Sequence, residues 1–205
     1  MKISTAIKKI PVSFFGILLL VSWKDTAERQ STIRNDEVNT VAPKGAITKW
    51  NADPATAQVK FSIGGPFGTV HGKLSGLKST ILFDENNLAA SSINASVESK
   101  SISTGIGLRN RDLQKEKYLN SEKYPLLSFR SDKIQKSATG YKAIGSLTIK
   151  GVTKQVEIPF SFSAKGNTGV FKGSFTIKRQ DYGIGSSGGS IGSTVTIDLE
   201  IPVTK

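Results

Sequence analysis

Apolar residues recur at every second position over most of the chain after residue 46. Val59, Phe61 and Ile63 alternate with the polar Lys60 and Ser62. Side chains two positions apart lie on the same face of a strand, so each such segment has one face for a core and one for water. The same alternation is present in 70–74, 81–83, 93–97, 127–129, 141–149, 156–162, 171–177 and 195–203.

Strands with one polar face are typical of an antiparallel sheet, and turn residues separate them here. About eight strands joined mostly by short turns indicate either a closed up-and-down barrel or a sandwich. Gly72, Gly145 and Gly173 fall on the inward face, where they permit strong bending. We therefore predict an all-β, eight-stranded antiparallel barrel. One short helix, over Leu108–Asn120, interrupts the alternation and ends before Pro125.

The first residues have the pattern of a secretory signal peptide. Lys2, Lys8 and Lys9 precede an apolar run over 10–23, which is short of the roughly 20 residues that a membrane span needs. An uncleaved anchor or a buried helix is the alternative. We predict a signal peptide over 1–23, a flexible leader over 24–45 and the barrel domain over 46–205. Export by a bacterial-type route to the periplasm or beyond the cell follows from this assignment.

Composition excludes several kinds of chemistry. The 205-residue chain has no cysteine and a single histidine, His71, whose phase in its strand points it to solvent. Thiol catalysis and cysteine metal sites are therefore excluded, and we predict no metal, no cofactor and no catalytic residue. The net charge of +12 is compatible with binding to nucleic acid or to an anionic membrane. The lysines are spread singly, however, which favours an ordinary solvated surface.

The inward face is rich in phenylalanine and branched aliphatic residues. An eight-stranded barrel is just wide enough to be filled by its own side chains or to hold one small ligand, and periodicity alone leaves both interiors open. If space remains, its occupant must be apolar. The predicted lining residues are Phe61, Ile63, Phe67, Phe83, Phe129, Phe160, Phe162, Phe171 and Phe175.

From Trp50 onward the chain resembles the YceI-like family of exported lipid-binding proteins. The resemblance implies a lipocalin-like barrel that holds a polyisoprenoid or similar amphiphile in an apolar tunnel, with no catalysis. The segments that carry it are Phe61–Ile63, Gly72–Leu77, Ile81–Asp84, Ser101–Gly105, Tyr118–Pro125, Leu126–Phe129, Gly145–Lys154 and Arg179–Ile184.

The chain departs from the family pattern in polar positions. Thr56-Ala57 stands where the family often has histidine-serine, and the segment 109–113 keeps its arginine and leucine but lacks the family's aspartate and histidine. Arg109 and Arg179 are the residues that we predict near a ligand head at the barrel mouth. The apolar lining is better preserved than this polar end.

These observations predict an exported protein that binds a long apolar amphiphile, of polyisoprenoid, isoprenoid quinone or fatty-acyl type, for transport, storage or stress protection. One alternative is an enzyme acting on a hydrophobic substrate inside the barrel. Another is a basic barrel that binds nucleic acid or anionic membrane, although inward phenylalanines argue against a nucleic-acid platform. We expect no nucleic-acid partner, transient contact with anionic membrane at most, and a monomer or homodimer.

Overall fold

A computed structural model of the chain describes residues 47–205, so the predicted signal peptide and the predicted leader lie outside the described residues. The described part is built mainly of strands, with α1 (Gly107–Gln114) and three short 3-10 turns, η1 (Leu88–Ala90), η2 (Ser99–Ser101) and η3 (Arg179–Tyr182). The strands are β1 (Lys49–Ala52), β2 (Gln58–Gly65), β3 (Gly68–Leu74), β4 (Lys78–Leu82), β5 (Ser92–Glu98), β6 (Leu126–Ser137), β7 (Gly140–Ile149), β8 (Val152–Lys165), β9 (Thr168–Lys178) and β10 (Thr194–Thr204).

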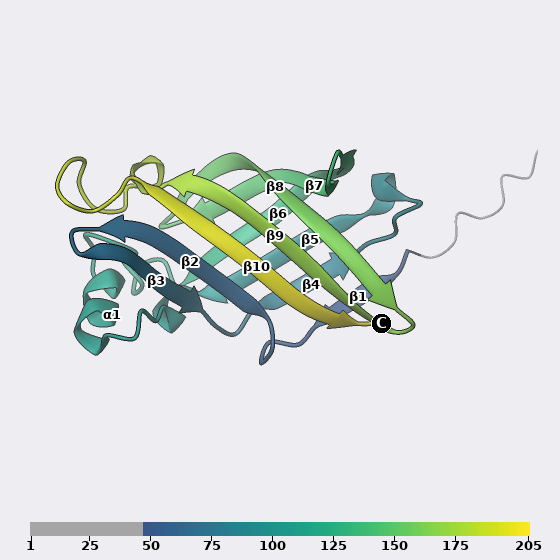
Figure 1. The fold of residues 1–205 in the computed structure, drawn as a ribbon, viewed down its shortest axis with the longest axis horizontal. Helices are drawn as coiled ribbons and strands as arrows, with labels where there is room; N and C mark the ends of the chain where they lie inside the picture. The colour runs from purple at the N-terminus through teal and green to yellow at the C-terminus, as the bar shows by residue number, and fades with distance from the viewer. Residues whose placement is uncertain (1–46) are drawn as a thin grey trace, which may run out of the picture. The chain divides into compact units, whose positions relative to one another are not determined.

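All ten strands belong to one antiparallel sheet, and β1 closes it into a barrel (Figure 1). Trp50 of β1 pairs with Ile81 of β4, and Asn51 pairs with Thr204 of β10. The closed ring is therefore β1, β4, β5, β6, β7, β8, β9 and β10. This confirms the predicted eight-stranded antiparallel barrel and excludes the sandwich.

The strands β2 and β3 form a hairpin outside the closed ring. β2 pairs along β10, next to the segment of β10 that pairs with β1. β3 has no second strand partner among the described residues and meets the chain again at Ser103, through backbone hydrogen bonds of 2.8 and 2.9 Å with Lys73. The sheet thus opens beside this hairpin, and the hairpin forms a side wall of the interior.

Local sequence explains the curvature of the wall. Ala143, Gly145, Leu147 and Ile149 alternate along β7 as its buried positions. A bulge between Ser131 and Lys133 displaces β6 toward β7, and a side chain at position 145 would collide with backbone atoms there. Glycine at 145 is therefore required for this bend.

The helix is shorter than the sequence predicts: α1 ends at Gln114, not at Asn120. Lys115 has extended backbone angles, and the chain then folds back on the helix. The amides of Leu119 and Ser121 donate to the carbonyls of Leu113 and Gln114 at 3.0 and 2.9 Å. Because the helix ends at Gln114, its last carbonyls have no partners within the helix, and these amides supply them.

The core falls into two clusters at the two ends of the barrel. The aromatic end, where the turns 138–139 and 166–167 lie, contains Trp50, Phe83, Phe160, Phe162 and Phe171. At the α1 end, where α1, the turn 66–67 and the loop 179–193 lie (Figure 1), the fully buried residues are aliphatic apart from Tyr182, and the half-buried Phe61, Phe129 and Phe175 pack against them. No helix in the described residues has the length and apolar content that crossing a bilayer requires.

Candidate functional site

The barrel is hollow between the two clusters. A cavity of about 940 Å³, here called the chamber, extends from Phe160 and Phe171 toward the α1 end. Its wall is formed by most strands of the barrel, by the β2–β3 hairpin and by α1. Ligand pockets typically have volumes of about 300–1,000 Å³, so the chamber has the capacity to hold a sizeable ligand.

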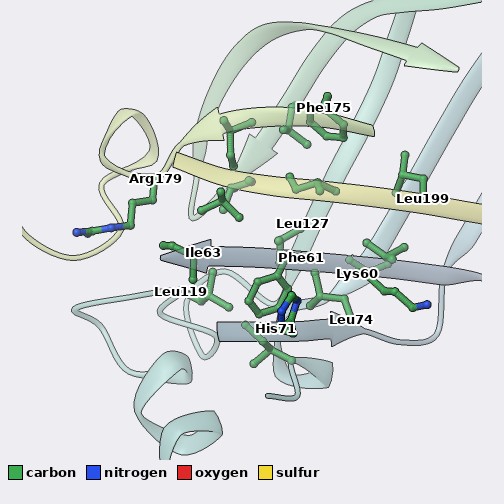
Figure 2. A pocket seen from close by; sticks show the side chains of 18 of the residues that line it. Lys60, Phe61, Ile63, His71, Leu74, Leu119, Leu127, Phe175, Arg179 and Leu199 are labelled. Atoms are coloured by element: carbon green, nitrogen blue, oxygen red, sulfur yellow. The ribbon is translucent and has the colours of Figure 1, made fainter. Parts of the chain in front are cut away.

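The chamber wall is chiefly hydrocarbon. Figure 2 shows Phe61 and Ile63 of β2, Leu74 of β3 and Phe175 of β9 around it. Several of these side chains are half-buried although they face inward, because they border empty space rather than packed atoms. One polar exception is Ser79 of β4, whose buried Oγ has no hydrogen-bond partner among the described residues.

The structure brings most of the predicted lining residues to the chamber. The residues found there are Phe61, Ile63, Phe67, Phe129, Phe160, Phe171 and Phe175. They come from four strands and one turn, so the barrel gathers positions that are far apart in sequence. Whether they contact a ligand stays a prediction.

Phe83 and Phe162 are placed differently. Phe83 is 1% exposed and meets the rings of Tyr141, Phe160, Phe162 and Phe171 with centroids 5.1–5.7 Å apart. Neither Phe83 nor Phe162 borders the chamber. The alternation correctly predicted that both rings point inward. At their level of the barrel, however, aromatic rings that face one another fill the interior. The prediction that they line the cavity is therefore wrong.

Phe67 borders the chamber from outside the strand wall. It lies in the turn between β2 and β3 and is fully exposed. β2 ends at Gly65, so Phe67 does not continue the alternation of inward and outward side chains along that strand. Phe67 is thus a residue of the chamber mouth, not of its interior.

The two predicted head-group residues differ in what they already bind. Arg179 is 5% exposed, and its guanidinium donates to the carbonyls of Gly192, Ile184 and Ile191 at 2.8, 2.7 and 3.2 Å. In Figure 2 its side chain extends toward that loop. Arg179 therefore anchors the loop 183–192, and its contact with a ligand head is not supported by this geometry.

Arg109 is the freer of the two cations. It lies on α1 at the chamber wall and is half-buried. The neighbouring carboxylate of Asp112 forms its ion pair with Lys115, at 2.7 Å. Arg109 makes no ion pair within residues 47–205, so its charge is available at the mouth.

Titratable chemistry is sparse around the chamber. His71 is exposed, as its phase predicts, but it also borders the chamber (Figure 2), as Asp112 does. Residues 47–205 contain no group of three His, Cys, Asp or Glu that would hold a metal ion. Burial, with a smaller effect of the Asp181 charge, raises the pKa of Tyr182 above its ordinary value. The Tyr182 hydroxyl has no hydrogen-bond partner in this part of the chain.

The predicted lining, eight phenylalanines and Ile63, omits much of the wall. The alternation already placed the aliphatic residues inward, so the signal was present, but aromatic size was given more weight than position. The aliphatic wall residues not named as lining are Leu74, Leu77, Ile81, Ile93, Leu127, Leu147, Ile149, Ile158, Ile197 and Leu199. Ser79 carried no such signal, because a serine on an inward phase is common.

The closed antiparallel barrel and its internal apolar chamber define a lipocalin-like class of protein. Within that class the chain belongs to the YceI-like domain family, whose pattern it matches over residues 50–203. A UPF0312 protein of Yersinia enterocolitica is 29% identical over 141 residues, which are 66% of this chain and 73% of that protein. Both comparisons cover the barrel.

Solved structures show the same fold. BcnA of Burkholderia cenocepacia superposes with a TM-score of 0.71 at 24% identity, covering 75% of this chain and 100% of BcnA. A polyisoprenoid binding domain from Saccharophagus degradans, described as implicated in plant cell wall breakdown, gives a TM-score of 0.59 at 14% identity, with 76% and 97% covered. At these identities the likeness establishes the fold alone.

Proposed function

We propose that this protein binds one long apolar amphiphile, of polyisoprenoid, isoprenoid quinone or fatty-acyl type, in the chamber. The observation that carries the proposal is a cavity of about 940 Å³ whose wall is chiefly aliphatic and aromatic. Each methylene moved from water into such a site contributes about 0.8 kcal/mol, so a long chain binds through desolvation alone. The polyisoprenoid binding domain from Saccharophagus degradans, which shares the fold, supports this choice of ligand.

The polar head of the ligand stays at the α1 end. Arg109 lies at that end of the wall without an ion-pair partner in the described residues, so it favours an anionic or strongly polar head. The hydroxyl of Ser79 lies deeper, and a ligand oxygen there would satisfy it. The aromatic end has no such group at the chamber floor formed by Phe160 and Phe171.

Binding without catalysis is the role we assign. An enzyme would need an acid or base that faces the substrate. The buried Arg179 is occupied by three loop carbonyls, the carboxylate of Asp112 is paired with Lys115, and His71 borders the chamber from an exposed position. Seven of the eight phenylalanines in residues 47–205 lie inside the barrel wall, away from the surface that stacking on nucleic-acid bases requires. Neither alternative gains support from this arrangement.

Export completes the proposal. The basic and apolar pattern of residues 1–23 supports delivery to the periplasm or the exterior, where a lipid needs a carrier between membranes. Transport, storage and protection of the lipid under stress all use the same binding step. Mass measurement of secreted protein would show loss of the signal peptide over 1–23, and a retained signal peptide would contradict export by cleavage.

Extraction of the purified protein with organic solvent, followed by mass spectrometry, tests the binding itself. We expect an apolar amphiphile at close to one per protein. Phe175→Asp puts a carboxylate on the chamber wall and should abolish retention, whereas Thr176→Asp, on the exposed face of the same strand, should retain the lipid. Circular dichroism checks that both variants keep the barrel. A wild-type extract without lipid, or a Phe175→Asp extract that still contains it, would overturn the proposal.

A further inference from the structure

The two ends of the barrel differ in what they expose. Five large apolar side chains are exposed within residues 47–205, with exposed fractions between 42% and 102%, and all five lie at the α1 end. They come from four separate segments: the β2–β3 turn, the start of α1, the start of β6 and the loop before β10. They are Phe67, Ile106, Leu108, Leu126 and Ile191. Exposed apolar side chains gathered at one site mark an interaction surface.

Charge follows the same division. The connections at the α1 end, 66–67, 99–125, 150–151 and 179–193, contain eight basic residues against four acidic ones, a net charge of +4. The connections at the aromatic end, 53–57, 83–91, 138–139 and 166–167, contain three acidic residues and no basic ones, a net charge of −3. The connections that carry the apolar tips are thus net basic, whereas those at the opposite end are net acidic.

The exposed tips also border the chamber mouth. Phe67 and Ile191 both belong to the chamber lining, and Arg109 follows Leu108 in the first turn of α1. Backbone hydrogen bonds connect these segments: Gly192 donates to Gly64 at 2.8 Å, and Gly185 donates to Lys117 at 2.8 Å. The Arg179 guanidinium fixes the loop that carries Ile191. The mouth is therefore held as one platform, not as independent loops.

We propose that the α1 end docks on the surface of an anionic phospholipid bilayer, with Phe67, Leu108 and Ile191 inserted among the lipids. Separate apolar tips ringed by lysine and arginine fit the interface of a bilayer, where apolar groups enter the acyl boundary and cations meet anionic head groups. Docking in this orientation places the chamber mouth against the phase from which an apolar ligand comes. The biological role of docking rests on the proposed function, whereas the docking orientation does not depend on it.

A cysteine-free chain allows a site-specific test in the full-length protein. Ser186→Cys in the loop 183–192 and Asn167→Cys in the turn at the aromatic end each provide one exposed attachment point for a polarity-sensitive nitrobenzoxadiazole dye. On addition of vesicles of phosphatidylcholine with phosphatidylglycerol, we expect the dye at 186 to brighten and shift to shorter wavelength, and the dye at 167 to remain unchanged. Equal responses at both positions would overturn the proposed orientation.

Two sets of substitutions then test the apolar and charged parts. Phe67→Ser combined with Leu108→Ser should abolish the shift at position 186. Arg111→Gln combined with Lys117→Gln should weaken it and reduce its salt dependence, while the matched pair Lys136→Gln and Lys165→Gln near the aromatic end should leave it unchanged. A shift that survives the Phe67→Ser, Leu108→Ser pair overturns insertion of the tips.

The outcomes separate docking from ligand binding. Absence of a shift at 186 in protein that still yields an extracted lipid overturns docking and leaves the proposed function standing. A shift at 186 in protein from which no lipid is ever extracted supports docking and overturns the proposed function. Burial of the dye at 186 with rising protein concentration and no vesicles, accompanied by a doubled mass in sedimentation, would show that a second copy covers this end and would also overturn bilayer docking.

Discussion

The aromatic end and the α1 end of the barrel arise from the same alternation of inward and outward side chains, but they fill space differently. At the aromatic end Phe83 meets four rings edge-on or nearly so, and the interior is solid. Toward the α1 end the inward residues are mostly branched or linear aliphatics that leave a chamber of about 940 Å³. Alternation decides which way a side chain points, and the shapes that meet at one level decide whether space remains.

The largest expected effect tests whether the two ends differ in stability as they do in packing. Phe83→Ala should lower the free energy of unfolding by about 3–5 kcal/mol, because a fully buried ring leaves a cavity among its neighbours. Phe175→Ala should cost roughly 1–2 kcal/mol, because its half-buried ring already borders empty space. Urea unfolding of lipid-free protein measures both. Equal losses would mean that the chamber wall is packed in solution.

The next effect concerns the loop that completes the α1 end. Arg179→Met should destabilise the protein by about 1.5–3 kcal/mol, because three charge-assisted hydrogen bonds to loop carbonyls are lost. Amide hydrogen exchange should accelerate across 183–192 and leave the aromatic end protected. Lys178→Met, at the exposed neighbouring position, is the control and should change neither quantity. Unchanged exchange in Arg179→Met would show that the loop is held by other contacts.

A smaller effect comes from narrowing the chamber. A side chain at position 72 would collide with the ring of Phe61, so Gly72→Ala forces that ring deeper into the chamber at a cost of about 1–2 kcal/mol. The extracted lipid should become shorter or scarcer. At Gly64, on the neighbouring strand, an added methyl group meets nothing within 4 Å, so Gly64→Ala should leave both stability and lipid unchanged. An unaltered lipid in Gly72→Ala would contradict a tight fit beside Phe61.

The sequence was sufficient for the fold because period-two segments and turn residues leave few alternatives. It placed Phe61, Phe129 and Phe175 on the inward face, and the family resemblance agreed. It failed where register matters: Phe83 follows β4 and Phe162 lies on β8, and the closed ring brings the two rings to one level, with centroids 5.1 Å apart. The strand registers of a barrel depend on pairing between strands, which the sequence of one strand alone does not specify.

The remaining misses are local. Phe67 was predicted to line the interior, but β2 ends at Gly65 and the turn places Phe67 in solvent. Arg179 follows β9 and was expected at a ligand head. Its partners are backbone carbonyls of a loop, and backbone groups carry no sequence signal. The apolar chamber was therefore more predictable than its mouth.

The smallest effect distinguishes the two ends by pH. The Tyr182 hydroxyl is buried at the α1 end without a partner in the described residues, so Tyr182→Phe should change stability at neutral pH by less than about 0.5 kcal/mol. Burial, with a smaller contribution from Asp181, raises the pKa of Tyr182 above 10.0, so the folded state holds its proton more tightly than the unfolded state does. That stabilisation is fully present below pH 10 and is lost as the pH rises through the folded pKa.

Wild-type protein should therefore lose stability above about pH 10 faster than Tyr182→Phe does. Tyr141, whose pKa is raised chiefly by its hydrogen bond with Glu85 at the aromatic end, is present in both proteins and cancels in the comparison. Parallel pH profiles of the two proteins in urea unfolding would mean that the Tyr182 hydroxyl is hydrated, and that water enters the α1 end beyond the chamber.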